Sequence, residues 1–134
     1  MRQSAAIAVV VAVILAGCTS TPKPAQQSKR PKSESAQTLM VRVAKRMQAC
    51  WFKGKDPAFK KYKMATEINS YAGKPRVLIV PKNKPTGLPK MVVQAERIGG
   101  RNVLTSFGPL TQSSNGGRLT SAIRKWERGG TSCA

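Results

Sequence analysis

Three cysteines and one short run of lysines are the side chains of this sequence with the most distinctive chemistry. The cysteines are Cys18, Cys50 and Cys133, and the lysines fall within eleven residues: Lys53, Lys55, Lys60, Lys61 and Lys63. A thiolate can be acylated or form a disulfide bond, and neighbouring ammonium groups attract anions. The whole chain is strongly basic, with 24 Lys and Arg residues against five Asp and Glu residues, for a formal net charge of +19.

The amino-acid composition argues against acid–base catalysis and against metal binding. Histidine, the side chain best suited to proton transfer near neutral pH, is absent. The acidic residues lack the clustered spacing of a zinc or calcium site, because they are spread along the chain as Glu34, Asp56, Glu67, Glu96 and Glu127. No C-x-x-C pair suggests a redox centre. The sequence therefore predicts a binding or structural protein that is not an enzyme and holds neither a metal nor another cofactor.

The N-terminus has the pattern of an export signal. Arg2 precedes an uninterrupted apolar run over residues 5–16, which is shorter than the roughly 20 residues that span a bilayer and matches the apolar stretch of a signal peptide. The run ends in Leu15-Ala16-Gly17-Cys18, which closely resembles the lipobox of bacterial lipoproteins. That resemblance implies a signal peptide over residues 1–17 and a diacylated, N-acylated Cys18. An ordinary secretory signal with an incidental cysteine is the alternative.

The same resemblance implies a location. Residue 19 is Thr19, not the aspartate that retains such lipoproteins in the inner membrane, so we expect an outer-membrane lipid anchor with the domain facing the periplasm. Three acyl chains give stable anchoring. Residues 18–35 form a Pro-containing, polar stretch that predicts a disordered basic linker. Its basic side chains either contact anionic lipid or only keep the linker soluble.

Cys50 and Cys133 are the two thiols that remain once Cys18 is lipidated. Because the periplasm is oxidising and no other pairing is available, we expect one disulfide bond between them. The competing interpretation is one buried thiol and one free thiol near the C-terminus.

Hydrophobic periodicity predicts a small α+β domain over residues 36–134. Apolar residues recur at helical spacing from Leu39 to Trp51 and again from Leu119 to Trp126, whereas alternation or apolar runs predict strands near 62–69, 77–80, 91–96 and 103–107. Gly99-Gly100 predicts a hairpin turn. The order indicates an antiparallel sheet of three or four strands flanked by an N-terminal and a C-terminal helix packed on one face. Both tryptophans lie on apolar helix stripes and are expected in the core.

One further resemblance concerns the whole domain. A helix ending in Cys50-Trp51, an antiparallel hairpin, and a closing helix with Ser121-Ala122-Ile123 followed by a cysteine are similar to the C-terminal domain of TolA and the related TonB domain, over roughly residues 39–133. The chain departs from that pattern in its Ala72-Gly73 turn, where TolA-type domains typically carry Asn/Asp-Gly, and in its Pro-rich loop at 83–89. The resemblance implies strand pairing with partner proteins along a sheet edge, and it transfers no particular binding residue.

The lysines at 53–63 are either an anionic contact surface or a solvated basic face, and the interleaved Phe59 and Tyr62 are more simply core residues. We therefore predict a non-enzymatic lipoprotein that is held on the membrane by its lipid and contacts an envelope protein or an anionic glycan or lipid. The alternative is a polyanion-binding module for lipopolysaccharide, anionic lipid or nucleic acid, of which nucleic acid is an uncommon ligand in the periplasm.

Overall fold

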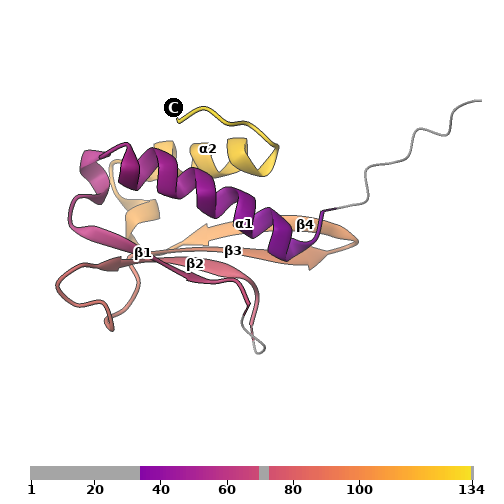
Figure 1. Cartoon of the computed structure of the whole chain (residues 1–134), viewed down its shortest axis with the longest axis horizontal. Helices are drawn as coiled ribbons and strands as arrows, with labels where there is room; N and C mark the ends of the chain where they lie inside the picture. Colours follow the sequence, from indigo (N-terminus) through magenta and orange to yellow (C-terminus); the bar gives the residue numbers. More distant parts are fainter. Residues whose placement is uncertain (1–33, 70–72, 134) are drawn as a thin grey trace, which may run out of the picture.

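The structure, a computed structural model, describes residues 34–69 and 73–133. The signal peptide predicted for residues 1–17, the lipidated Cys18 and the linker up to residue 33 lie outside the described residues. The elements follow one another as α1 (Ala36–Met47), η1 (Gln48–Lys53), η2 (Pro57–Phe59), β1 (Tyr62–Glu67), β2 (Arg76–Pro81), β3 (Met91–Ile98), β4 (Arg101–Phe107), η3 (Pro109–Gln112) and α2 (Gly116–Glu127) (Figure 1). Over this part of the chain, no helix combines the length and the hydropathy needed to cross a membrane.

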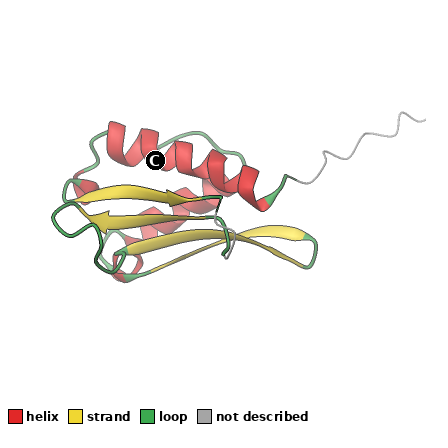
Figure 2. Cartoon of the chain, turned by 60° about the horizontal axis from the view of Figure 1, so that its bottom comes forward, coloured by secondary structure: helices red, strands yellow, loops and turns green. Residues whose placement is uncertain are grey.

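The four strands form one antiparallel sheet in the order β1-β2-β3-β4. The register pairs Met64 with Ile79, Ile79 with Met91 and Ala95 with Leu104, so these side chains share one face of the sheet. Both α-helices lie over that face (Figures 1 and 2). The predicted α+β class is confirmed, with four strands in the sheet.

The core lies between the sheet and the helices, and it uses the apolar positions that the periodicity predicted. Trp51 and Trp126 are 1% and 0% exposed, as expected for core residues. Other buried contributors come from both helices and from inward-facing positions of β2 and β3, and they include Met40, Val43, Met47, Leu119, Ile123, Val77, Ile79, Met91, Val93 and Ala95. Because strand alternation sends every second side chain inward, a one-residue slip in any pairing would expose this set.

The first helix changes its winding near its end. Ser35 caps α1 by accepting a hydrogen bond from the Thr38 backbone N–H at 3.0 Å. The periodicity predicts one continuous helix as far as Gly54, whereas the structure winds Gln48–Lys53 as a π-helix before Gly54. A π-helical turn has i→i+5 hydrogen bonds, and the Gly54 N–H bonds the Ala49 carbonyl in this way at 2.9 Å.

A disulfide bond joins the end of η1 to the C-terminal tail. Cys50 and Cys133 are 83 residues apart in sequence, and their Cα atoms lie 5.2 Å apart. The structure thus agrees with the pairing predicted from the cysteine count. Trp51 follows Cys50 and contacts Trp126 of α2 with ring centroids 5.1 Å apart, so the bond and the core fix η1 together.

Arg42 of α1 fastens α2 at its C-terminal end. Its guanidinium donates to the backbone carbonyls of Trp126 and Glu127, where a cation is favoured by the helix dipole. It also pairs with Glu34 at 2.8 Å. The hydrogen bond with Glu34 raises the pKa of Arg42 and, from the other side, lowers the pKa of Glu34.

Candidate functional site

The five lysines predicted as one cluster divide over several surfaces. Lys55 and Lys60 line one cavity, Lys61 lines a neighbouring cavity, and Lys53 lines a third cavity. Lys63 lies on β1 between Tyr62 and Met64, which face the core, so it belongs to the opposite face of the sheet. The sequence cluster is therefore not one surface.

The first cavity, here called the aromatic pocket, has a volume of about 460 Å³. Its walls are apolar and are formed by Trp51, Phe52, Pro57 and Phe59. Its lysines come from two segments: Lys55 and Lys60 lie on the same stretch as the walls, together with Asp56, and Lys82 lies in the loop after β2. The volume lies within the range of small-molecule sites, which are mostly apolar with a few polar groups that orient the ligand.

The aromatic walls form a packed unit. The rings of Trp51 and Phe59 are stacked, with centroids 4.5 Å apart and planes 10° from parallel, and Phe52 contacts Phe59 at 5.4 Å. Trp51 and Phe59 are buried, whereas Phe52 is half-buried. The indole N–H of Trp51 is also buried, and it finds no hydrogen-bond partner among the described residues, although most buried N–H groups have one.

The loop at the mouth of the aromatic pocket has a backbone conformation that the chain must hold in place. Lys55 has a φ of 54°, a left-handed conformation that is uncommon outside glycine. Asp56 then caps η2 by accepting from the Ala58 N–H at 3.0 Å, and Arg118 of α2 binds the same carboxylate at 2.6 and 3.2 Å. These contacts fasten the loop to α2.

Asp56 is the one carboxylate at the pocket, and its charge is already engaged. Burial raises the pKa of Asp56, but the hydrogen bonds from Arg118 and the Ala58 N–H outweigh it, so that the pKa lies below the usual value. The carboxylate therefore stays ionised at neutral pH and is neutralised by Arg118, so it does not compensate the pocket lysines.

A second cavity of about 360 Å³ adjoins the first, because Lys82 lines both. Lys61 and Lys90 line it as well. The backbone holds these segments together through the Lys82 N–H, which donates to the Lys61 carbonyl at 3.0 Å. Together with Lys84 of the same loop, these residues form what we call the basic end: Lys55, Lys60, Lys61, Lys82, Lys84 and Lys90.

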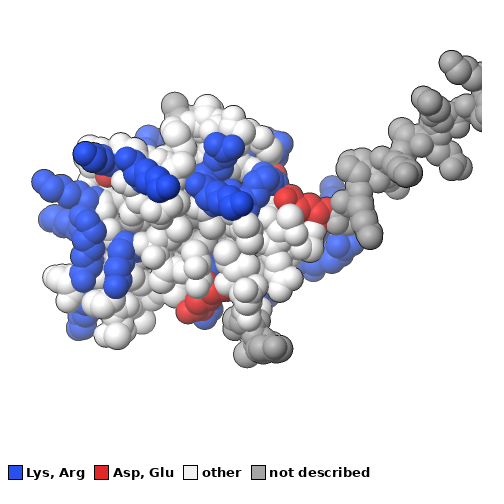
Figure 3. Space-filling model, in the orientation of Figure 1, with Lys and Arg blue, Asp and Glu red and all other residues white. Residues whose placement is uncertain are grey.

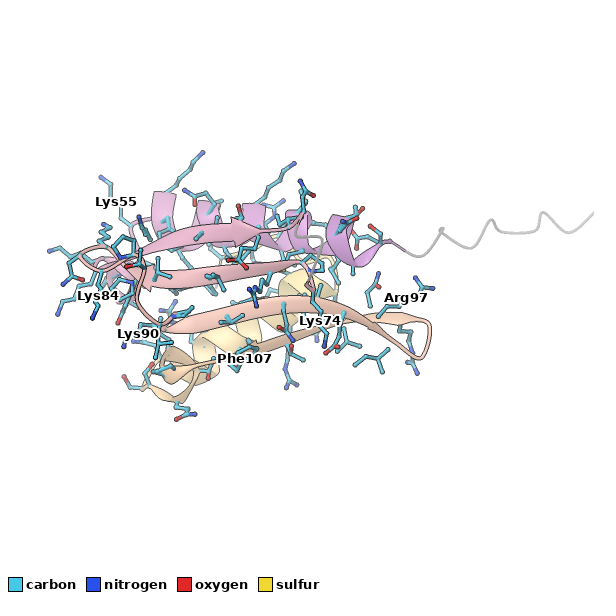
Figure 4. All side chains as sticks on the ribbon, turned by 90° about the horizontal axis from the view of Figure 1, so that it is seen from below. Lys55, Lys74, Lys84, Lys90, Arg97 and Phe107 are labelled. Atoms are coloured by element: carbon cyan, nitrogen blue, oxygen red, sulfur yellow. A yellow bond between two sulfur atoms is a disulfide. The ribbon has the colours of Figure 1, made fainter. Side chains whose placement is uncertain are left out.

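Figures 3 and 4 show the basic end in space. Lys and Arg side chains gather at the end of the molecule where η1, η2 and the loop at 82–90 meet (Figure 3, left). Lys55, Lys84 and Lys90 lie at this end, whereas Lys74 and Arg97 lie at the other (Figure 4). The basic end is therefore one of the places where Lys and Arg side chains gather, and others are visible across the middle of the molecule (Figure 3).

The carboxylates other than Asp56 are all engaged away from the basic end. Glu34, Glu67 and Glu96 form ion pairs, and Glu127 accepts a hydrogen bond from the Leu104 N–H at 2.9 Å; the ion pairs are Glu34–Arg42, Glu67–Arg76 and Glu96–Lys74. None of the six lysines of the basic end pairs with a carboxylate of the described residues. Their positive charge is compensated only by solvent and by whatever binds there.

A third cavity, here called the edge groove, lies between α1, η1 and β1 and measures about 420 Å³. Val41, Ala44, Met64 and Ile68 make it apolar, and Lys45 and Lys53 flank it. β1 is an edge strand of the sheet and pairs only with β2 among the described strands. The groove thus runs beside a strand edge that is open on this side of the described domain.

Lys82, Lys84 and Lys90 of the basic end were not predicted. The antiparallel pairing of Tyr62 with Pro81 brings their segment beside Lys60 and Lys61. The sequence signal was the apolar run ending at Pro81, which gives the strand but not its partner or register. Tyr62 lies half-buried beside the core, and Phe59 is inside it, as expected. No group of three His, Cys, Asp or Glu side chains suited to a metal comes together within residues 34–69 and 73–133.

Comparison of the chain with protein-family models, curated proteins and solved structures found no match. The resemblances to bacterial lipoproteins and to the TolA and TonB domains therefore stay predictions from the sequence.

Proposed function

We propose that this protein is a non-enzymatic envelope lipoprotein, anchored in the outer membrane through Cys18, whose periplasmic domain binds anionic envelope lipid through its basic end. The observation that carries the proposal is the concentration of six lysines without a carboxylate partner at one end of the domain, around two cavities. The aromatic pocket favours a lipid over a purely ionic polymer, because it adds apolar surface to the charge.

The positive charge of the basic end supports an anionic membrane surface as the partner. A basic residue near an anionic membrane gains about 1 kcal/mol, and the attraction falls off within a Debye length, roughly 8 Å at physiological ionic strength. The lysines of the basic end come from one end of the molecule, so several of them can lie within that distance of one lipid surface at the same time.

The anchor is tested by substitution of the residue that the lipobox requires. Cys18→Ser is expected to leave unprocessed precursor, because only a thiol forms the thioether to diacylglycerol, and mass spectrometry of the mature native chain is expected to show three acyl groups at Cys18. A Cys18→Ser chain that is processed normally and leaves the membrane fraction would contradict the anchor.

The binding surface is tested on the mature chain with Cys18→Ser, so that no lipid anchor contributes. Cosedimentation is measured with vesicles of phosphatidylglycerol and phosphatidylcholine, and with phosphatidylcholine alone. Lys60→Gln with Lys82→Gln is expected to weaken binding to the anionic vesicles roughly 10- to 30-fold, from about 1 kcal/mol for each lysine. Arg97→Gln with Arg101→Gln removes the same charge at the other end of the sheet and is the matched control. Equal losses in both double variants would contradict a local site.

A second candidate function is contact with a protein through the edge of β1. The edge groove favours it, because an added strand would pair with the open edge and place alternate side chains in an apolar groove. Strand pairing is expected to persist at moderate salt, whereas binding to a polyanion collapses. Photo-crosslinkers at positions 53 and 60 separate the two in cells: protein adducts from position 53 alone indicate strand pairing, and lipid adducts from position 60 indicate the basic end.

A further inference from the structure

We infer that the aromatic pocket holds the acyl chain of a phosphorylated lipid, with the phosphate bound by Lys60 and Lys82 at its mouth. The inference rests on the proposed function and names the part of the lipid that this site recognises. It concerns a single lipid molecule held by its chain and its phosphate, whereas the proposed function needs only a charged surface.

The side chains that line the pocket favour a ligand that has both an apolar part and an anionic part. Four apolar side chains form its walls, and three lysines line it with them, two from the same stretch of chain as the walls and one from the loop after β2. An inorganic anion would satisfy the lysines and leave the apolar surface of half-buried Phe52 and exposed Pro57 in contact with water. A neutral apolar ligand would cover the walls but would also remove water from the lysine ammonium groups without supplying a counter-charge. That desolvation is unfavourable.

The charges in the pocket are not satisfied from within the domain. Asp56 is held by Arg118 at 2.6 Å and by the Ala58 N–H at 3.0 Å, so its oxygens already have donors. Lys60 and Lys82 are exposed, and neither ammonium group has a hydrogen bond or an ion pair with a side chain of the described residues. A phosphate between them would be attracted by two cations. The nearby carboxylate of Asp56 would repel it little, because Arg118 already neutralises that carboxylate.

The walls of the pocket are fixed before a ligand arrives. Trp51 is stacked on Phe59 and lies next to the disulfide-bonded Cys50, and Pro57 restricts the loop that closes the opposite side. A preformed apolar surface lowers the entropic cost of binding a flexible chain. Phe52, which is half-buried, is the aromatic wall residue that can be changed with least damage to the core.

The adjoining cavity favours a phosphorylated lipid over a simple fatty acid. Lys82 is shared by both cavities, and Lys61 and Lys90 continue the cationic surface beyond it. A phosphate monoester carries more charge than a carboxylate and presents more acceptor oxygens, so it can engage lysines from both cavities at once.

The test is a calorimetric titration that measures the affinity of the mature chain for dodecyl phosphate. The chain carries Cys18→Ser, and dodecyl phosphate is kept below its critical micelle concentration. Inorganic phosphate and dodecyl maltoside are the two comparison probes, since one carries only the anion and the other only the chain. Dodecyl phosphate is expected to bind at least tenfold tighter than either. Equal affinity for dodecyl phosphate and inorganic phosphate would overturn the inference, and so would equal affinity for dodecyl phosphate and dodecyl maltoside.

Two variants locate the site. Phe52→Ser is expected to weaken the binding of dodecyl phosphate at least fivefold, because it removes part of the apolar wall and no charge. Lys82→Glu, at an exposed position, tests the phosphate contact if Phe52→Ser does not fold, and it is expected to abolish the preference for dodecyl phosphate over dodecyl maltoside. Arg97→Gln with Arg101→Gln is the control and is expected to change neither measurement more than twofold.

The outcomes separate this inference from the proposed function. If Phe52→Ser leaves dodecyl phosphate binding unchanged, the acyl chain does not occupy the pocket and the inference is wrong, while vesicle binding that depends on Lys60 and Lys82 still supports the function. If the wild-type chain does not cosediment with anionic vesicles at all, the proposed function is wrong irrespective of the pocket.

Discussion

Removal of the disulfide bond is the most informative perturbation of this domain. The bond joins Cys50 in η1 to Cys133 in the C-terminal tail, and it closes a loop across a sequence separation of 83 residues. Cys50 precedes Trp51, which packs on both Phe59 and Trp126, so the bond supports the aromatic pocket as well as the junction with α2.

The size of the effect follows from the length of the closed loop. In the chain-entropy model, a loop of 83 residues restricts the unfolded chain by about 4.5 kcal/mol at 25 °C. Small domains are stable by roughly 5–15 kcal/mol in total, so the free energy of unfolding should fall by a large fraction. With a urea m-value of about 1–3 kcal/mol/M, the unfolding midpoint should fall by roughly 1.5–4.5 M.

The assay is urea unfolding of the mature chain, carrying Cys18→Ser, followed by tryptophan fluorescence. Both tryptophans are buried and therefore report loss of the core. Cys50→Ala with Cys133→Ala is the test variant, and the parent chain in dithiothreitol is the control, because reduction removes the bond without a change in sequence. The two should unfold at closely similar urea concentrations. A loss of stability below about 1 kcal/mol in both would refute the argument from chain entropy.

Two further perturbations test contacts around the site and the second helix. Asp56→Asn keeps a side-chain acceptor for η2 but removes the ion pair with Arg118, and it should cost about 0.5–1 kcal/mol at pH 7 in urea unfolding, since Arg118 is partly exposed. Because the folded pKa of Asp56 lies below the unfolded value near 4, this contribution is present above that pH and is lost as the pH falls through the folded pKa, so parent and variant should converge in acid. Gly116→Ala and Gly117→Ala form a matched pair at the start of α2: a Cβ at 116 would overlap the Thr111 carbonyl, whereas a Cβ at 117 meets nothing within 4 Å. Thermal unfolding should show Gly116→Ala destabilised by roughly 1–3 kcal/mol and Gly117→Ala stabilised by about 0.5 kcal/mol, and the opposite order would contradict the described packing.

The helices and strands were largely predictable, because each leaves a local pattern in the sequence. Alternation from Tyr62, the apolar run before Pro81 and the Gly99-Gly100 turn fall where the structure has β1, the end of β2 and the β3–β4 hairpin. The π-helical winding of Gln48–Lys53 was not predictable from spacing. The segment is only six residues long, little more than one helical turn. Over so short a stretch, an α-helix and the wider π-helix place the same apolar side chains inward.

The candidate site was only partly predictable, because it depends on contacts between distant segments. Lys55 and Lys60 were candidate anion-contacting residues in the sequence, with a solvated basic face as the alternative, but Lys82 joins them only through the pairing of β1 with β2. The bond from Arg118 to Asp56 spans 62 residues, and no local pattern indicates it. Charge counting therefore predicted the kind of surface, while the register of the sheet determined which lysines form it.

The basic end lies at the opposite end of α1 from Glu34, the point at which the described chain begins (Figure 1). The 12 residues of α1 alone separate the two by about 18 Å. A protein held at Cys18 and at the basic end by one leaflet would therefore be bivalent. Avidity would make even millimolar intrinsic affinity for a lipid sufficient, since the tether holds the local ligand concentration in that range. Substitutions at the basic end should then change the orientation of the domain on the membrane, and leave its retention there to the anchor.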